Sequence, residues 1–463
     1  MTLTRTLSET GLETDADGIR PEAYAAAKKM VLDTLGCALA GWNAPGVTEV
    51  VEQMCDWGGK PEATILFRDQ RLPAPNVVLA NSAMIHALDY DDVHIPGVLH
   101  IMSVILPVAL AAGEMADASG KDVLAAVIMG VEVAGRLGIA YQSRCAGPQG
   151  AGLLPTSVVG GFGAVAAICR LLSRSVDECV NAMGINYAQV SGNRQALLDM
   201  TLTKRLQPGF AARSAMEAVM LAARRVTGPH NALEGRAGLF RVYQNAEPAT
   251  SEELAQPREM YEIERVSVKR YTSCGACHHA QIATERLVEE EGLQPEDVAR
   301  VELYGCGPGG LVGNPFVIGP NPQVCAQFSV QYGVALTLLR GRATLEHFTD
   351  EQVLANQDVV ELAQQITFTK EVGGLPDPSV GKVHAVIIHT RDGRRLVRWQ
   401  TREQTFAPDA MSLADVVAKF RDCAAFSGIC PPEQADQIVA SVQNLDGRER
   451  VSEALARWRL DVG

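Results

Sequence analysis

The segment Ala25-Ala-Ala-Lys-Lys-Met-Val-Leu-Asp-Thr-Leu-Gly-Cys-Ala-Leu-Ala40 places its apolar side chains at the spacing of an amphipathic helix. Sequence of the same character, rich in Ala, Leu, Val and Met, continues to about residue 250. Small residues in Val158-Val-Gly-Gly-Phe-Gly-Ala-Val-Ala-Ala167 would let neighbouring helices approach closely. Residues 1–260 are therefore predicted to form the first part of an all-helical domain.

The pattern changes after the Glu/Pro-rich stretch at residues 247–258. Runs at 266–269, 299–304 and 383–399 predict strands, and Asp392-Gly393 predicts a hairpin turn in the last run. Helices are predicted at 280–292 and 327–340, which makes residues 261–400 a smaller α/β lid domain. Residues 401–463 are predicted to return to the helical domain. The predicted fold class is mainly α with an α+β lid, in which both chain ends build the large domain.

Composition narrows the possible partners. At 463 residues the chain exceeds the usual size of one hydrophobic core, so two domains are expected. A net charge of −13 argues against nucleic acid, because phosphate binding needs a basic face. Eleven scattered cysteines fit reduced thiols, and no secretory h-region is visible at the start. The longest apolar stretch, Val123–Ala140, is interrupted by Glu132 and Arg136 and predicts no membrane span. We expect a cytoplasmic protein with no membrane partner.

One segment concentrates ionisable side chains. From His86 to His100 the chain reads His-Ala-Leu-Asp-Tyr-Asp-Asp-Val-His-Ile-Pro-Gly-Val-Leu-His, and its charged members are His86, Asp89, Asp91, Asp92, His94 and His100. A carboxylate can fix the tautomer of a neighbouring imidazole and raise its basicity, which suits acid–base catalysis. A polar helix end with a capping Asp is the alternative. The apolar run that follows, beginning at Ile101, favours an active site against a buried wall.

The pattern Cys274-Gly-Ala-Cys277-His278 matches a haem attachment motif and half of a zinc site. Haem attachment of this kind belongs to exported chains, and a structural zinc needs a second ligand pair, for which only isolated residues such as Cys306 and Cys325 follow. An iron–sulfur cluster would need more cysteines at suitable spacing. We therefore predict no metal, and a lone thiolate nucleophile has no support of its own.

Three further motifs are open to two interpretations. Lys204-Arg205 at a helix start is either a solvated basic turn or a carboxylate-binding feature. Tyr332, in a predicted helix, either packs in the core or faces a cleft. Gly305-Cys-Gly-Pro-Gly-Gly310 resembles a phosphate loop, but no helix start follows it, so a turn is predicted.

Taken together, five segments resemble the MmgE/PrpD family, which includes 2-methylcitrate dehydratases, cis-aconitate decarboxylases and iminodisuccinate epimerases. The segments are Val31-Leu-Asp-Thr-Leu-Gly-Cys-Ala-Leu-Ala-Gly41, His86-Ala-Leu-Asp-Tyr-Asp-Asp92 with His100, Lys204-Arg-Leu-Gln-Pro-Gly-Phe-Ala-Ala-Arg213, Tyr271-Thr-Ser-Cys-Gly-Ala-Cys-His278 and Gln327-Phe-Ser-Val-Gln-Tyr332. The resemblance implies a homodimer, a cleft site between the two domains and no metal or organic cofactor. It places site residues at Asp89, Asp92, His100, Lys204, Cys274 or His278, and Tyr332.

The chain departs from the family pattern at three places. Leu154-Pro155-Thr156 stands where His-Pro-Thr is frequent, Val93 where Thr commonly follows the Asp pair, and His100-Ile-Met-Ser where His-Pro-Ser or His-Pro-Gly is usual. A site with one proton-transfer group fewer and a more apolar lining predicts a different or less charged acid as substrate.

These residues suggest how a cofactor-free lyase would work. His100 would be the general base or acid, oriented by Asp89 or Asp92, with His278 or Tyr332 supplying the complementary proton. Lys204, with Arg205 or Arg194, would neutralise the substrate carboxylate, and His94 and Cys274 are further substrate-binding candidates.

The predicted function is that of a lyase for a small di- or tricarboxylic acid, most simply a hydro-lyase resembling 2-methylcitrate dehydratase. A decarboxylase or an isomerase or epimerase acting on a related acid is the alternative. A non-catalytic acid-binding relative, for which Leu154 is the best argument, and a metalloprotein using Cys274, Cys277 and His278 remain as hypotheses of other classes.

Overall fold

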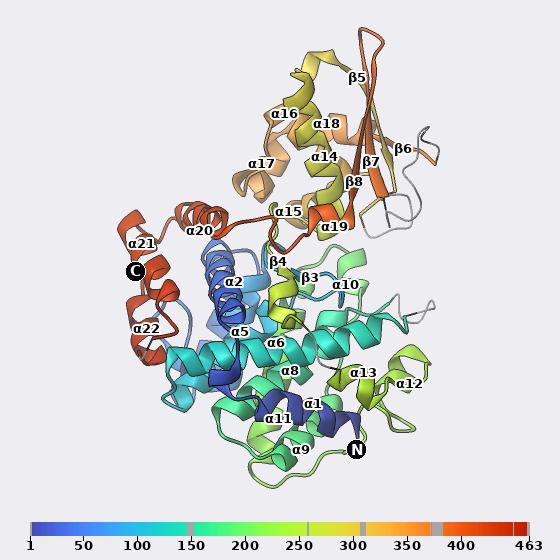
Figure 1. Ribbon diagram of the computed structural model, residues 1–463. Helices are drawn as coiled ribbons and strands as arrows, with labels where there is room; N and C mark the ends of the chain where they lie inside the picture. Colours follow the sequence, from blue (N-terminus) through green and yellow to red (C-terminus); the bar gives the residue numbers. More distant parts are fainter. Residues whose placement is uncertain are drawn as a thin grey trace.

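The computed structural model describes residues 2–145, 152–256, 259–305, 312–370, 372, 383–447 and 449–460. Two hydrophobic cores organise these residues. The larger core joins helices from residues 3–268 with helices from 416–458, and the smaller core lies almost wholly between residues 271 and 388. Figure 1 shows the corresponding helical part below and the α/β part above. The predicted fold class, mainly α with a smaller α/β part, is confirmed.

The first section of the helical part contains the long core helices and two small strand pairs. Strand β1 pairs antiparallel with β2, and β3 pairs antiparallel with β4. The elements are α1 (Leu3–Glu13), α2 (Pro21–Ala40), α3 (Val47–Trp57), β1 (Ala63–Thr64), β2 (Arg71–Leu72), α4 (Ala74–His86), β3 (Val93–His94), α5 (Met102–Met115), α6 (Gly120–Gln142), α8 (Pro155–Leu171), α9 (Val176–Tyr187), α10 (Gln195–Leu198), α11 (Gln207–Ala222), α12 (Leu239–Gln244), α13 (Ser251–Ala255) and β4 (Val266–Ser267), with 3₁₀ turns η1 (Ala16–Gly18), η2 (Leu202–Leu206) and η3 (Glu262–Arg265).

The α/β part has one four-stranded sheet in the order β6-β5-β7-β8, in which β5 and β6 are parallel and the other pairs antiparallel. The predicted hairpin is confirmed, since β7 and β8 pair around a turn in which Gly393 has a φ of 91°. Helix α14 packs against β7 and β8 and against α16. The elements are α14 (Gly275–Glu291), η4 (Pro295–Asp297), β5 (Val298–Tyr304), α15 (Pro322–Gln327), α16 (Val330–Arg340), η5 (Glu346–Phe348), α17 (Asp350–Ala355), α18 (Gln357–Gln365), β6 (Thr367–Phe368), β7 (Val383–Thr390), β8 (Arg395–Thr401) and α19 (Arg402–Thr405). Residues 306–310 of the turn predicted at Gly305–Gly310 lie outside the described residues.

The chain returns to the helical part through α20 (Leu413–Ser427), α21 (Pro432–Gln443) and α22 (Val451–Arg457). Figure 1 shows these red helices beside the blue helix α2. Helices α2 and α20 pack so closely that a Cβ on Gly36 would lie 3.3 Å from the Cα of Phe420. Both ends of the chain therefore contribute to one hydrophobic core.

Helix α6 is the longest helix described and crosses the helical part (Figure 1). A capping box of Ser119 and Asp122 starts it. The helix is longer than the apolar stretch Val123–Ala140, and by length and hydropathy alone it could cross a membrane. However, 94% of its most apolar 18-residue segment is buried inside the protein. The two charges within the stretch Val123–Ala140 also pair with each other, since Arg136 Nε donates to Glu132 Oε1 at 2.6 Å. Helix α6 is thus a core helix.

Strand β4 pairs with a different strand from the one that the sequence predicted. The run at 266–269 was expected to belong to the α/β unit, but β4 pairs Val266 with His94 and Ser267 with Val93 of β3. The consequence is functional, because this pairing brings the residues after Ser267 against the His/Asp-rich segment.

Candidate active site

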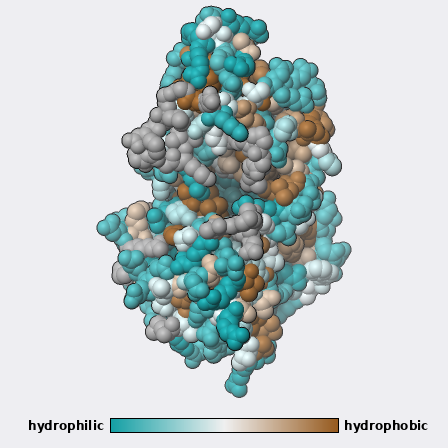
Figure 2. All heavy atoms as spheres, turned by 90° about the vertical axis from the view of Figure 1, so that its right-hand side faces the viewer, coloured by the Kyte–Doolittle hydropathy of each residue, from teal (hydrophilic) through white to brown (hydrophobic). Residues whose placement is uncertain are grey.

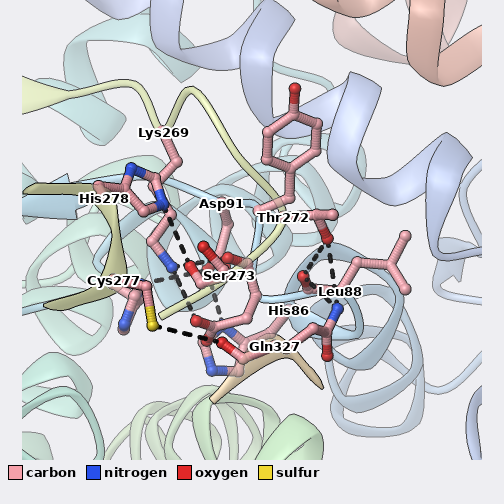
Figure 3. A network of polar contacts seen from close by, with 12 residues as sticks. His86, Leu88, Asp91, Lys269, Thr272, Ser273, Cys277, His278 and Gln327 are labelled. Carbon is pink, nitrogen blue, oxygen red and sulfur yellow. Dashed lines mark hydrogen bonds and ion pairs between the residues drawn. The ribbon is translucent and has the colours of Figure 1, made fainter. Parts of the chain in front are cut away.

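The loop after α4 is shaped by an unusual backbone. Helix α4 ends at His86, and Asp89 adopts a φ of 50°, the left-handed conformation that a short polar side chain tolerates best. Two side chains from the α/β part fix the loop: the amide of Gln327 and the hydroxyl of Thr272 both donate to the carbonyl of Leu88, at 2.8 and 2.7 Å (Figure 3). The sharp turn at Asp89 lets Asp89, Asp91 and Asp92 point in three directions.

Asp91 forms a dyad with His86. His86 Nδ1 donates to Asp91 Oδ2 at 2.7 Å, and the carboxyl group is completely buried (Figure 3). Burial would raise the pKa of Asp91, but the neighbouring His86 and His100 hold it below the usual range. Because an ionised carboxylate only accepts, the dyad places the proton on Nδ1 and leaves Nε2 of His86 as an acceptor.

His100 is held in the same tautomer by a different partner. Its Nδ1 donates to the backbone carbonyl of Asp92 at 2.8 Å, and its backbone amide donates to Thr156 Oγ1 at 2.9 Å. The rings of His86 and His100 meet edge to face, with centroids 5.0 Å apart. Burial and the positive charge of Lys269 lower the pKa of His100 to about 3. His100 is therefore a neutral imidazole with an unprotonated Nε2 at neutral pH.

Asp89 joins two lysines. The ammonium group of Lys204, from η2, donates to Asp89 Oδ1, and Lys269 Nζ donates to Asp89 Oδ2 at 3.0 Å and to its carbonyl at 2.7 Å. Burial would raise the pKa of Asp89, but Lys204 and Lys269 hold it well below the usual range. Two cations against one carboxylate leave this group with an excess positive charge.

Lys419 supports this group from the C-terminal helix α20. Its ammonium donates to the carbonyls of Tyr90 and Lys269, at 2.9 and 3.0 Å, and pairs with Asp33 of α2 at 2.7 Å. Lys419 and Asp33 are both buried. The returning C-terminal helix thus fixes the backbone on both sides of the Asp89 cluster.

Asp92 has a structural task. Its two carboxylate oxygens accept from the backbone amides of Ile101 and Met102, at 3.0 and 3.1 Å, where α5 begins. Burial and the charge of Asp91 raise its pKa well above the usual value. Asp92 positions His100 through its carbonyl, whereas Asp91 is the carboxylate that lies beside both imidazoles, 3.9 Å from His100 Nδ1.

A cavity of about 1040 Å³ lies between the two parts, and His86, Asp89, His100, Lys204 and Cys274 all line it. Figure 2 shows hydrophobic side chains reaching the surface at the waist between the parts. Among the described lining residues there are four cations and one carboxylate; the cations are Arg194, Lys204, Lys370 and Arg402, and the carboxylate is Asp89. Arg194 Nε is buried and has no hydrogen-bond partner among the described residues. An acidic protein therefore presents a cationic cavity, which favours anions.

Aliphatic side chains line the cavity beside the ionisable groups. Val93, Ile95, Val98 and Leu154 all contribute. Val98 adopts a φ of 55°, which is rare for a β-branched residue and typical of strained functional loops. Leu154 precedes the first turn of α8, two residues before Thr156, which binds the amide of His100. Leu154, the apolar residue predicted to depart from the family pattern, thus lies in the cavity wall.

Several predicted site residues lie outside the described cavity lining. His94 bonds to Glu262 at 2.8 Å, and Arg205 donates to the carbonyl of Pro45 and to Gln323. His278 Nε2 lies 3.3 Å from the carbonyl of Ser273 (Figure 3), and the Tyr332 hydroxyl donates to the carbonyl of His347 at 3.1 Å inside the smaller core. Burial lowers the pKa of His278 and raises that of Tyr332. Neither residue is among the described residues that line the cavity, which is what separates them from His100.

Other residues lie in the site although the sequence analysis did not assign them a role there. His86, Asp91 and Lys269 belong to the site by contact or by lining the cavity. Arg194, predicted as an alternative to Arg205, lines the cavity, whereas Arg205 is not among the described lining residues. His279, rather than its neighbour His278, lines the cavity, and its ring stacks on His384 with centroids 4.3 Å apart. His86 and Asp91 were visible in the cluster, whereas nothing local distinguishes Lys269.

Within the described chain, one group of side chains could hold a metal ion, made by His86, Asp91 and His100, whose donor atoms lie within 4.8 Å of one another. In the structure His86 Nδ1 hydrogen bonds to Asp91, and His100 Nδ1 hydrogen bonds to the Asp92 carbonyl. Cys274, Cys277 and His278 do not form such a group; Cys277 Sγ contacts the carbonyl of Gln327 at 4.0 Å instead.

Fold and site together define a two-part, mainly helical protein with a histidine–carboxylate cluster beside an anion-binding cavity. Residues 5–252 match the MmgE/PrpD N-terminal domain, and residues 271–446 match the MmgE/PrpD C-terminal domain. The chain belongs to the MmgE/PrpD family.

Individual relatives share about a quarter of their residues with the chain. The cis-aconitate decarboxylase of Homo sapiens is 27% identical over 438 residues, covering 92% of this chain and 88% of the relative. The cis-aconitate decarboxylase of Mus musculus is 27% identical over 92% of this chain and 87% of its own. The cis-aconitate decarboxylase of Aspergillus terreus is 27% identical over 76% of this chain and 75% of its own.

Proposed function

We propose that this protein is a lyase that acts on a small carboxylic acid with at least two carboxylate groups, by moving a proton at the carbon next to a carboxylate. The observation that carries the proposal is a neutral imidazole, His100, in a cavity where four described cations face one carboxylate. Lys204 and Arg194 would hold the substrate carboxylates and stabilise the negative charge that develops on proton removal. All proton carriers are side chains, so the proposal needs no cofactor.

Elimination of water is the reaction that this arrangement favours. His100 Nε2 takes the proton from carbon, the electron pair forms a carbon–carbon double bond, and the bond to the neighbouring hydroxyl breaks. The imidazolium returns the proton to the leaving hydroxide, so that water departs and His100 is again neutral. Asp91, beside both rings, stabilises the transient imidazolium.

Decarboxylation is the second candidate, and the names of the relatives favour it. There the carbon–carbon bond to a carboxylate breaks, carbon dioxide leaves, and the electron pair takes a proton. That step requires a donor, so His100 would have to enter the cycle protonated. The lowered pKa of His100 favours the base, and hence the hydro-lyase, in the resting protein.

Proton NMR in deuterated water tests both candidates with a panel of di- and tricarboxylic acids. Loss of water yields an alkene without loss of carbon, decarboxylation yields a product with one carbon fewer, and epimerisation exchanges one proton for deuterium. Binding of acids with none of these changes would instead indicate a non-catalytic acid-binding protein. His100→Ala is the control, because it retains Lys204 and Arg194 and removes the proposed base.

A further inference from the structure

A second hollow adjoins the main cavity. It has a volume of about 210 Å³ and shares Ser157 and Gln207 with the cavity as lining residues. Its inner end lies where α8 and α11 begin and α9 ends, and Asn186 of α9 contributes there. Ser157 directly follows Thr156, the residue that binds the backbone amide of His100.

The loop that closes this hollow is held by a close approach. Gly192 has a φ of 121°, and a Cβ at this position would lie 2.2 Å from the Cβ of Ser157. The carbonyl of Gly192 accepts from the amide of Leu154 at 3.3 Å, and Asn193 forms a β-bridge with Leu153. Glycine is required here by both the backbone conformation and the space. The hollow is thus fixed to the same chain segment as the cavity wall.

The lining of the hollow is polar and uncharged. Among the described residues that line it there is no Asp, Glu, Lys, Arg or His; the lining consists of Ser157, Asn186, Gln189, Val190, Ser191, Gly192, Asn193, Thr203, Gln207, Phe210, Ala211 and Ser214. The main cavity, with four cations, attracts carboxylates, whereas the hollow offers no charge to compensate one. Burying an uncompensated charge is costly, so the hollow suits an uncharged polar group.

Three polar atoms in this lining have no hydrogen-bond partner among the described residues: Ser157 Oγ, Asn186 Nδ2 and Gln207 Oε1. Their residues are more than nine-tenths buried, with exposures of 6, 1 and 7%. The amide of Gln207 is oriented by Nε2, which donates to the carbonyl of Asn193 at 3.0 Å, so the unpaired atom is the acceptor. Unpaired buried polar groups are rare in native proteins, and a shared location for three of them points to a ligand.

We propose that this hollow binds an uncharged substituent of the acid substrate that both donates and accepts hydrogen bonds, namely a hydroxyl or a carboxamide group. Such a group can accept from Asn186 Nδ2 and donate to Gln207 Oε1, with Ser157 Oγ able to do either. The inference rests on the proposed function, because it places the carboxylates of the same substrate at Lys204 and Arg194. Substrate selection is then divided between a cationic cavity and a neutral hollow.

Calorimetric titration with two matched pairs of acids tests this inference. Malate and succinate differ by one hydroxyl, and succinamate and pentanoate differ by an amide at equal charge. In the unmodified protein we expect the hydroxyl or carboxamide member of at least one pair to bind fivefold or more tightly than its partner. Ser157→Ala, which removes one oxygen atom, and Asn186→Leu should each bring that ratio to within twofold and leave succinate affinity unchanged.

Asn444→Leu, the same chemical change at an exposed position at the end of α21, is the matched control and should keep the ratio. If Asn186→Leu does not fold, Ser157→Ala alone decides the question. Equal affinity within both pairs, as expected for a hollow that holds only water, would overturn the inference and leave the proposed function standing. Failure of every acid to bind would overturn both.

Discussion

The two walls of the cavity are built from different chemistry. The wall from the helical part carries ionisable groups that bind one another, namely His86, Asp89, His100 and Lys204 with Asp91 and Lys269 behind them. The wall from the α/β part carries aromatic rings and a stacked histidine pair, together with Lys370 and Arg402; the rings are Tyr304, Phe328, Phe368 and Phe406. One wall therefore holds proton carriers in fixed tautomers, and the other offers shape and charge.

This difference follows from how each wall is supported. His100 is fixed by the Asp92 carbonyl and by Thr156, on segments that belong to the larger core. His279 bonds to the hydroxyl of Thr405 at 2.8 Å and has no carboxylate among its partners in the described part of the chain. An imidazole that takes a proton is stabilised by a nearby negative charge, and among the described residues it is the helical wall that places one, on Asp91, beside its histidines.

The largest expected effect separates the two walls directly. His100→Ala should lower kcat/KM by roughly 10³-fold, because a general base typically contributes 10²–10⁴-fold. His279→Ala, the matched change on the opposite wall, should lower it by less than about 10-fold, since that residue only shapes the cavity. Steady-state kinetics on the acid identified by NMR measures both. Similar losses in the two variants would mean that the walls share the chemistry.

Lys204→Ala should have the next largest effect. Removal of its ammonium leaves Asp89 paired with Lys269 and eliminates one cation from the cavity, so anion binding and transition-state stabilisation both weaken. We expect kcat/KM to fall by about 10²-fold, a loss typical of one electrostatic donor. Lys370→Ala, which removes a cation from the other wall, is the comparison and should cost less. Unchanged kcat/KM in Lys204→Ala would remove this residue from the anion site.

Much of this arrangement could be predicted from sequence where the information is local. The His86–His100 segment holds its histidines and carboxylates within fifteen residues, and the Lys204 turn is a basic motif next to a helix start. Helical periodicity and the Asp392-Gly393 turn likewise predicted the fold class and the hairpin. All of these signals arise between residues close in the chain.

The roles within the cluster depended on geometry that spacing does not contain. Adjacent residues at a left-handed turn point in unrelated directions, so the choice among Asp89, Asp91 and Asp92 as partner of a histidine was open. Lys269 reaches Asp89 because β4 pairs with β3, a contact between segments about 170 residues apart. His278 and His279 differ by one helical step of about 100°, which decides which of them lines the cavity.

A substitution at Leu154 tests what the aliphatic residues of the helical wall contribute to the choice of substrate. Because it lines the cavity and stands where the family resemblance predicts a histidine, we expect slow conversion of 2-methylcitrate and cis-aconitate, with kcat/KM below ~10⁴ M⁻¹s⁻¹. Leu154→His should raise the rate on cis-aconitate by about 10-fold, near the lower end of what one acid–base group provides. Leu154→Met is the control for a change of shape without a proton carrier. Efficient conversion by the unmodified protein would show that Leu154 does not redirect function.

The smallest expected effect is on the pH dependence of the free energy of unfolding. Here the histidines of the two walls should make similar contributions. Burial lowers the pKa of both His100 and His279 to about 3, from an ordinary value of 6.5. Between these values the unfolded chain binds more protons than the folded protein, so the free energy of unfolding falls as pH is lowered from 6.5 toward 3. Each histidine should contribute a slope of up to about 1.4 kcal/mol per pH unit. Urea unfolding at several pH values should show a shallower slope in His100→Gln and, to a similar extent, in His279→Gln. If only His279→Gln flattens the slope, the pKa of His100 is not lowered in the folded protein, and the donor role that decarboxylation requires becomes open to it.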